Sequence, residues 1–261
     1  MGNQSSFSGA KLKMQWAKRN HEALADSIGK YWKNNTDPIC IRTNVETGQK
    51  HACINLPEFS NWWPLCIGDV IHNLRSSLDH LAVEAAIANK QPSNTVSSGT
   101  YFPITTDANA FKPKGDAAKK IKHLNDAHKK IVEAYNLKDG GNRLLRDLHI
   151  LDIRDKHRML VPAAAALVSN NTMLILPQNH DGSFDGAAEM TMGHVSKFPL
   201  KNGDRIASYP IDQPDHHIRP DVTMAIAFGE GQPLEGEPVL ETLTRLGELV
   251  SEIIRAFEAD S

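Results

Sequence analysis

The sequence has little cysteine, almost no net charge and no long hydrophobic run. Three cysteines among 261 residues are too few for a disulfide framework, and their odd number leaves at least one free thiol. Such usage is typical of a reducing compartment, so we expect a cytoplasmic protein. No run approaches the roughly 18 apolar residues of a membrane-spanning helix, and we therefore expect no transmembrane association.

The charge balance excludes another class of protein. The 29 basic and 31 acidic residues leave a formal net charge of −2, which argues against a protein that coats nucleic acid or membranes by bulk charge. A local basic patch remains compatible with this balance. The motifs of phosphate-binding loops, dinucleotide-binding folds and serine hydrolases are also missing. We expect no cofactor.

Metal ligation is not indicated either. His180, His216 and His217 lack the spacing of a zinc site, and we interpret them as loop residues, with no metal expected. The segment 181–186 has carboxylates and glycines but lacks the ligand pattern of a calcium loop, and it is interpreted as a hairpin turn.

The first six residues, Met-Gly-Asn-Gln-Ser-Ser, satisfy the short N-myristoylation pattern, with Gly2 as acceptor and Ser6 as the hydroxyl residue. The simpler interpretation is a serine-rich segment that leads into the first helix. We favour it because the pattern is short. A single acyl chain would in any case give only marginal membrane binding.

Periodicity of apolar residues predicts the helices. Residues at helical spacing occur in five segments, 8–33, 64–89, 116–137, 142–160 and 237–259. Asp116 suits the N-cap of the third helix, and Gly140-Gly141 separates it from the fourth. The region 90–115 is rich in Pro, Ser, Thr and Gly and is interpreted as a loop with a short turn at 108–111.

Alternating residues predict the strands. Residues 39–45 and 51–56 flank a turn and indicate a hairpin, and short apolar runs between turn clusters indicate an antiparallel sheet over 163–230. We therefore predict an α+β fold with a mainly helical part (10–160), the sheet, and a C-terminal helix (237–259) that packs back on the earlier helices. All of it is expected to form one interleaved domain, residues 1–261.

The second predicted helix, 64–89, gathers several polar residues on one face. A turn of about 100° per residue places His72, Arg75, Ser76 and Asp79 within one arc, with His80 at its edge. Arg75 and Asp79 are four residues apart and can pair, so a solvated charged face explains the pattern. The alternative is metal-independent RNA cleavage. A histidine exchanges protons near neutral pH, a guanidinium grips phosphate, and RNA supplies its own 2′-hydroxyl nucleophile.

The segment Arg75-Ser-Ser-Leu-Asp-His80 resembles the Arg-x(4–6)-His motif of HEPN domains, helical bundles of many bacterial ribonucleases, toxins and antiviral systems. Residues 68–80, Tyr101-Phe-Pro-Ile104 and 148–158 look like a family of uncharacterised bacterial and phage HEPN-like proteins. That resemblance covers roughly residues 10–160.

The resemblance implies a HEPN-like helical bundle and a metal-independent endoribonuclease, in a toxin or defence setting. In it, Arg75 would orient an RNA phosphate and His80 would act as acid or base, at the interface of a homodimer. HEPN enzymes often carry Asn, Asp or His after the arginine, where this chain has Ser76. Many HEPN-like proteins are also non-catalytic, so the alternative is a binding or regulatory module.

Two carboxylates of the fourth predicted helix share its apolar face. Asp152 and Asp155 fall on the same side as Leu144, Leu148, Leu151 and Met159. An unpaired buried charge is costly. We therefore expect this helix to pack on residues 64–89, with Asp152 or Asp155 bonded to the group of His72, Arg75 and His80.

Two interpretations of these aspartates stay open. The favoured one is a buried ion-pair latch between two helices. In the other, an aspartate sets the tautomer of a catalytic histidine, and Lys156 and His157, together with Arg158, lie at the rim of the site.

Residues 112–130 contain seven lysines and only two carboxylates. This local excess is able to meet RNA phosphates, although such a run is more often a solvated helix face. RNA is thus the candidate partner beside a second copy of the chain. A further hypothesis, with less support, is a small ligand in a cleft between the sheet and the helices.

Overall fold

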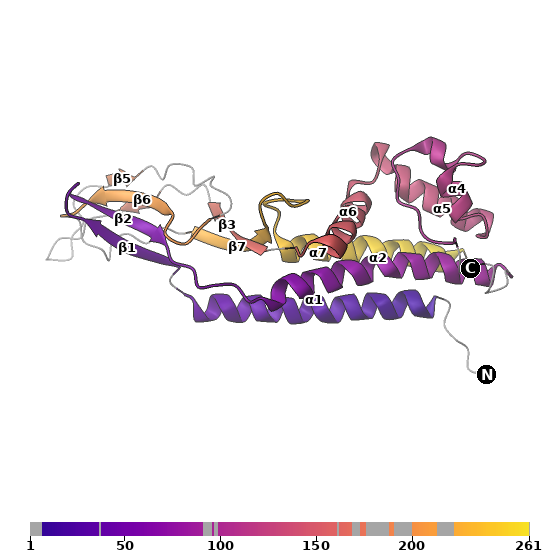
Figure 1. Ribbon diagram of the computed structural model, residues 1–261, viewed down its shortest axis with the longest axis horizontal. Coiled ribbons are helices and arrows are strands. Elements are labelled where there is room, and N and C mark those ends of the chain that lie inside the picture. Colours follow the sequence, from indigo (N-terminus) through magenta and orange to yellow (C-terminus); the bar gives the residue numbers. More distant parts are fainter. Residues whose placement is uncertain are drawn as a thin grey trace. The chain divides into compact units, whose positions relative to one another are not determined.

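The computed structural model describes residues 7–36, 38–90, 96, 99–160, 162–168, 173–175, 188–190, 200–212 and 222–260 (Figure 1). The protein has an α+β fold, as expected. The chain groups into two compact units. A helical unit comprises Met1–Asp26, Asn61–Val161 and Val239–Ser261, and a strand unit comprises Ser27–Ser60 and Pro162–Pro238. The expectation of a single domain stays a prediction.

The helical unit is built on four long helices, α1 (Ser8–Asn34, whose last part belongs to the strand unit), α2 (Trp62–Ala88), α6 (Arg143–His157) and α7 (Val239–Ala259). The apolar periodicity that predicted α7 is its buried face, from Val239 through Leu246 to Phe257. This face packs on α2, α5 and α6. The prediction that the C-terminal helix returns to the earlier helices is therefore confirmed.

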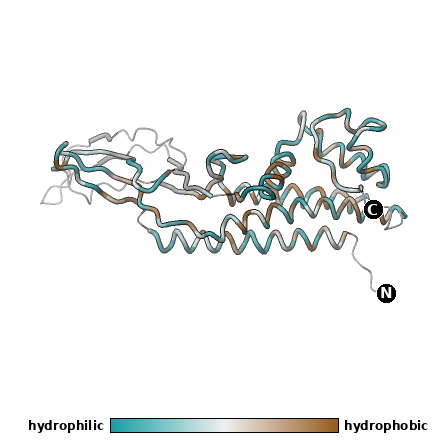
Figure 2. Tube along the Cα trace, in the orientation of Figure 1, coloured by the Kyte–Doolittle hydropathy of each residue, from teal (hydrophilic) through white to brown (hydrophobic). Residues whose placement is uncertain are grey.

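The leucine stripe of α2 forms the centre of the same core. The residues of that stripe are almost completely buried: Ile67, Ile71, Leu74, Leu78, Leu81 and Ala85. Hydrophobic positions recur along α2 and α7 in Figure 2. The burial of α2 extends beyond this stripe and includes the polar side chains of Asn73, Arg75 and Ser77.

The predicted single helix over 116–137 is wrong. The chain forms α4 (Asp116–Lys120) and α5 (Asp126–Leu137), and Asp116 lies in the first turn of α4 after Gly115 rather than at its N-cap. The break has a local cause. The Asn125 side chain accepts a 2.7 Å hydrogen bond from the backbone N–H of His128 and starts a new helix. Two short 3-10 turns, η1 (Ala108–Phe111) and η2 (Lys138–Gly140), flank this region, the first where a turn was expected.

The fourth predicted helix is shorter than expected. Asn142 caps α6 by accepting from the backbone N–H of Leu145, and the helix ends at His157. Arg158 is extended, so the chain buries Leu160 and leaves Met159 59% exposed. The prediction that Met159 shares the buried face is therefore wrong.

The strand unit contains the expected hairpin, β1 (Ile39–Asn44) and β2 (Gln49–Ile54), and β6 (Arg205–Pro210) continues it as an antiparallel sheet in the order β1-β2-β6. Two further antiparallel pairs are β3 (Pro162–Val168) with β7 (Val222–Phe228), and β4 (Met173–Ile175) with β5 (Ala188–Met190). The unit's own core gathers around Ala52, Ile54, Leu56 and Leu200. The prediction of antiparallel strands is confirmed, but among the described residues the strands of 163–230 do not form one sheet, because β6 pairs with the hairpin.

Several expectations lie outside the described residues, namely those for Gly2 and Ser6, for His180, His216 and His217, and for the turn at 181–186. Cys40, Cys53 and Cys66 are all free thiols. No helix within the described ranges has the length and apolar character that crossing a membrane requires.

Candidate functional site

The expected packing of α2 on α6 is confirmed, and a glycine permits it. At Gly68 of α2, a Cβ atom would collide with the carboxylate of Asp155 on α6. Asp155 is half-buried. Burial raises the pKa of its carboxyl above the ordinary value, and the charges of Asp152 and Asp69 act in the same direction. The close approach of the helices thus crowds carboxylates together.

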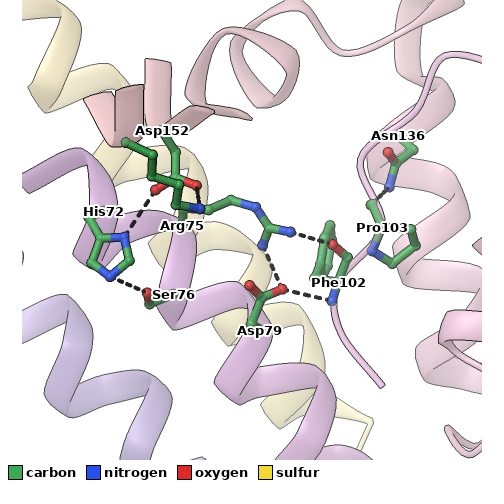
Figure 3. A network of polar contacts seen from close by, with 9 residues as sticks. His72, Arg75, Ser76, Asp79, Phe102, Pro103, Asn136 and Asp152 are labelled. Carbon is green, nitrogen blue, oxygen red and sulfur yellow. Dashed lines mark hydrogen bonds and ion pairs between the residues drawn. The ribbon is translucent and has the colours of Figure 1, made fainter. Parts of the chain in front are cut away.

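Asp152 is the carboxylate that joins the two helices. It is buried, and its Oδ1 lies 3.1 Å from His72 Nδ1 (Figure 3). Its Oδ2 accepts a 2.6 Å hydrogen bond from Lys156 Nζ. The prediction of an aspartate bonded to the Arg-His group is confirmed for Asp152 and His72. Lys156 belongs to this cluster, whereas His157 is exposed in the last turn of α6.

His72 is held in one orientation by its two neighbours. Its side chain is half exposed, with Nδ1 at Asp152 and Nε2 3.4 Å from Ser76 Oγ. A carboxylate only accepts, so Nδ1 carries the hydrogen that meets Asp152. In the neutral ring, Nε2 is then the unprotonated nitrogen, able to accept a proton.

Arg75 has a different environment. Its guanidinium is buried, Nη1 donates to Asp79 Oδ1 at 2.7 Å, and Nη2 donates to the backbone oxygen of Phe102 at 2.9 Å. Asp79 Oδ1 also accepts the backbone N–H of Phe102 at 3.1 Å. These three residues form a closed ring of hydrogen bonds (Figure 3). We name Arg75, Asp79 and Phe102 the latch from here on; it is a different group from the ion pair that was expected between the two helices.

The latch fixes a loop as well as a side chain. Next to Phe102, the Asn136 side chain of α5 donates to the Pro103 oxygen at 3.0 Å and accepts from the Thr105 N–H at 2.8 Å. The segment from Phe102 to Thr105 is therefore held by α2 on one side and by α5 on the other. Such side-chain bonds satisfy backbone groups that have no partner in a helix or strand.

His80 lies on another side of α2. Two residues five positions apart on a helix point about 140° from each other. His80 is exposed and faces α1, since a Cβ at Gly9 would lie 3.0 Å from His80 Nδ1. Glu84 takes part in the same contact by accepting from the Gly9 N–H at 2.7 Å. The motif spacing therefore does not bring Arg75 and His80 together within the chain.

The sequence did not lead us to one residue of the polar group around Asp152, His72 and Lys156. His149 lies on the same face of α6 as Asp152 and Lys156, and its Nδ1 is buried without a hydrogen-bond partner. Burial lowers the pKa of His149, and the Arg75 cation lowers it further, against smaller opposing effects of carboxylates. The helical spacing of 149, 152 and 156 was the available signal. His149 is not part of the apolar stripe of α6, and a search limited to that stripe therefore passes over it.

The arrangement holds two histidines, an arginine, a lysine and three carboxylates (Asp79, Asp152 and Asp155) between α2, α6 and the loop at Phe102. Across the part of the chain that the structure describes, no group of three or more His, Cys, Asp or Glu is placed to hold a metal ion. The chemistry available from these side chains is proton transfer and charge stabilisation.

Comparison with known proteins identifies no relative. No family model matches the chain, and neither a curated protein nor a solved structure matches it significantly. The HEPN-like resemblance therefore stays a prediction.

Proposed function

We propose that the helical unit is a HEPN-like, non-catalytic binding module in which Arg75, Asp79 and Phe102 serve as a structural latch. The observation that carries this proposal is the state of the Arg75 guanidinium, which is buried and already bonded through Nη1 and Nη2. A guanidinium that orients a phosphate must present paired N–H donors to it. Here a phosphate would have to displace a carboxylate and a backbone carbonyl.

The place of His80 supports the same proposal. Its exposed ring faces α1, whereas Arg75 faces the loop at Phe102. An acid or base must reach the proton that it transfers, directly or through one water. Within one chain these two side chains do not converge on a common phosphate. RNA and a second copy of the chain remain the candidate partners of the module.

RNA integrity in EDTA tests the proposal. The full chain is incubated with mixed RNA beside His80→Ala, and a metal-independent ribonuclease serves as the positive control. We expect the RNA to stay as intact with the wild-type chain as with His80→Ala and with buffer. Cleavage that persists in EDTA and disappears in His80→Ala overturns the proposal.

One observation favours a second candidate, a metal-independent ribonuclease centred on His72. This histidine is half exposed, Asp152 holds its Nδ1 while only the Ser76 hydroxyl contacts its Nε2, and the same aspartate holds the Lys156 cation. The same RNA assay includes His72→Gln. Cleavage that is lost in His72→Gln but kept in His80→Ala, with unchanged folding of both, supports this candidate instead.

A further inference from the structure

Three lysines of the run noted in the sequence line a hollow in the helical unit. The cavity measures about 540 Å³ and is lined by Gly99, Tyr101, Asp116, Lys119, Lys120 and Lys122, which we name the lysine pocket. Cavities of this order suit small ligands. The lysines come from α4 and the turn that follows it, and Tyr101 comes from the loop beside the latch.

The charge of the lysine pocket is positive. Three ammonium groups face one carboxylate, and that carboxylate, Asp116, is paired with Lys119 at 3.0 Å. Lys122 is exposed, and Lys120 lies with Nζ 4.4 Å from the centre of the Tyr101 ring. A concentration of ammonium groups in a hollow attracts an anion more strongly than scattered surface lysines do.

The walls of the pocket are held by the fold. Tyr101 directly precedes Phe102, whose backbone N–H and oxygen are both bonded in the latch. Ala117 and Ile121 are buried and anchor α4 and its following turn, which carry the three lysines, in the core. The latch thus holds the backbone next to the residue that brings the aromatic ring to the pocket.

We propose that the lysine pocket binds a nucleotide, with the phosphate at the lysines and the base against Tyr101, either as a free nucleotide or within single-stranded RNA. Ammonium groups bind phosphate oxygens, and bases stack on aromatic side chains. Lys120 covers one face of the Tyr101 ring, and a phosphate that draws Lys120 toward itself uncovers that face. The inference rests on the proposed binding role and names its ligand.

Fluorescence anisotropy of the full chain tests the inference with two probes, a labelled single-stranded RNA and a labelled mononucleotide. A pocket variant carries Lys119→Gln, Lys120→Gln and Lys122→Gln. The matched control carries Lys129→Gln, Lys130→Gln and Lys138→Gln, the same charge change outside the pocket. A third variant, Tyr101→Leu, removes the ring without changing the charge, and inorganic phosphate serves as competitor.

We expect the pocket variant to lose at least about tenfold in affinity and the control to lose less than about threefold. Tyr101→Leu should lose about tenfold, since base stacking on one aromatic ring is worth roughly 1–3 kcal/mol. Phosphate should compete with the probe. Tight binding of RNA alone identifies a strand as the ligand, and binding of both probes identifies the nucleotide itself.

Two results overturn the inference: neither probe binds, or the pocket variant and its control lose the same affinity. Its failure is distinguishable from that of the proposed function. Cleavage of the RNA probe contradicts the non-catalytic module and leaves the pocket in place, whereas binding that ignores the pocket lysines contradicts the pocket alone.

Discussion

Neighbouring charged residues of α2 and α6 differ in how the fold accommodates them. Arg75 and Asp152 are buried and bonded to groups of opposite charge or to carbonyl oxygen, as buried charges require. Asp155 and His149 lack such full compensation. The pKa of Asp155 is therefore raised and that of His149 lowered, and both shifts favour the neutral form of the group. The stability of the helical unit should therefore depend on pH through these two residues.

His149 should make the protein less stable in mild acid. Because its folded pKa lies below the ordinary value of 6.5, the unfolded chain takes up a proton first as the pH falls. The free energy of unfolding then decreases from about pH 7 downward. In His149→Gln the free energy of unfolding should fall less between neutral and mildly acidic pH than it does in the wild type. Urea midpoints of both proteins at neutral and mildly acidic pH measure it, and identical pH dependence would contradict the assignment.

Asp155→Asn should stabilise the protein at neutral pH. The folded pKa of Asp155 is raised, so its contribution is full below the unfolded value of 3.8 and is lost as the pH rises through the folded pKa. An amide cannot carry this charge, so we expect the variant to be more stable than the wild type at pH 7 and to lose that advantage in acid. Thermal unfolding across pH measures it. A destabilised variant at pH 7 would show instead that Asp155 is a required ion-pair partner.

The sequence was sufficient to predict an aspartate of α6 bonded to the polar face of α2, because burial of a charge demands a partner. It did not distinguish Asp152 from Asp155, since both fall on the same arc. It also did not show that Arg75 turns to the Phe102 carbonyl. That partner belongs to a loop 27 residues away, and helical spacing carries no information on loop positions.

At the scale of elements, the contact between α2 and α6 depends on the missing side chain at Gly68. Gly68→Ala should lower the free energy of unfolding by up to about 1 kcal/mol, because its methyl group displaces the Asp155 carboxylate and the better helix propensity of alanine offsets part of that cost. Gly247→Ala in α7 is the matched control, because open space surrounds that position. There, alanine should stabilise the helix by about 0.5–1 kcal/mol. Chemical denaturation measures both changes, and equal effects would contradict the tight contact.

Helix identity followed from periodicity, whereas two helix boundaries did not. The break between α4 and α5 occurs inside an apolar pattern that continues through Ile121 and Leu124, both buried. Asn125 begins a second helix there because its side chain caps a backbone N–H. Capping residues also occur inside solvated helices, so the pattern alone favoured one continuous helix.

For the whole molecule, the α+β class and the return of the last helix were predictable, since each follows from local patterns and from the need to bury an apolar face. The pairing of β2 with β6 was not. It joins segments more than 150 residues apart, for example His51 with Ser208, whose side chains also meet at 2.9 Å. No periodicity within a strand specifies its distant neighbour.

The latch joins α2 to the loop that carries the Tyr101 wall of the lysine pocket, so its loss should affect the whole helical unit. Urea unfolding of Arg75→Met, Asp79→Leu and the double variant forms a cycle that isolates the pair. It is the most direct measurement of the central claim that Arg75 stabilises the fold.

We expect Arg75→Met to lower the free energy of unfolding by about 2–4 kcal/mol, because it leaves the Phe102 oxygen unpaired and Asp79 with the Phe102 N–H but without its cation. The double variant should lose less than the sum of the single variants, with a coupling of at least about 1 kcal/mol. An Arg75→Met protein as stable as the wild type, with no coupling to Asp79, would contradict the account.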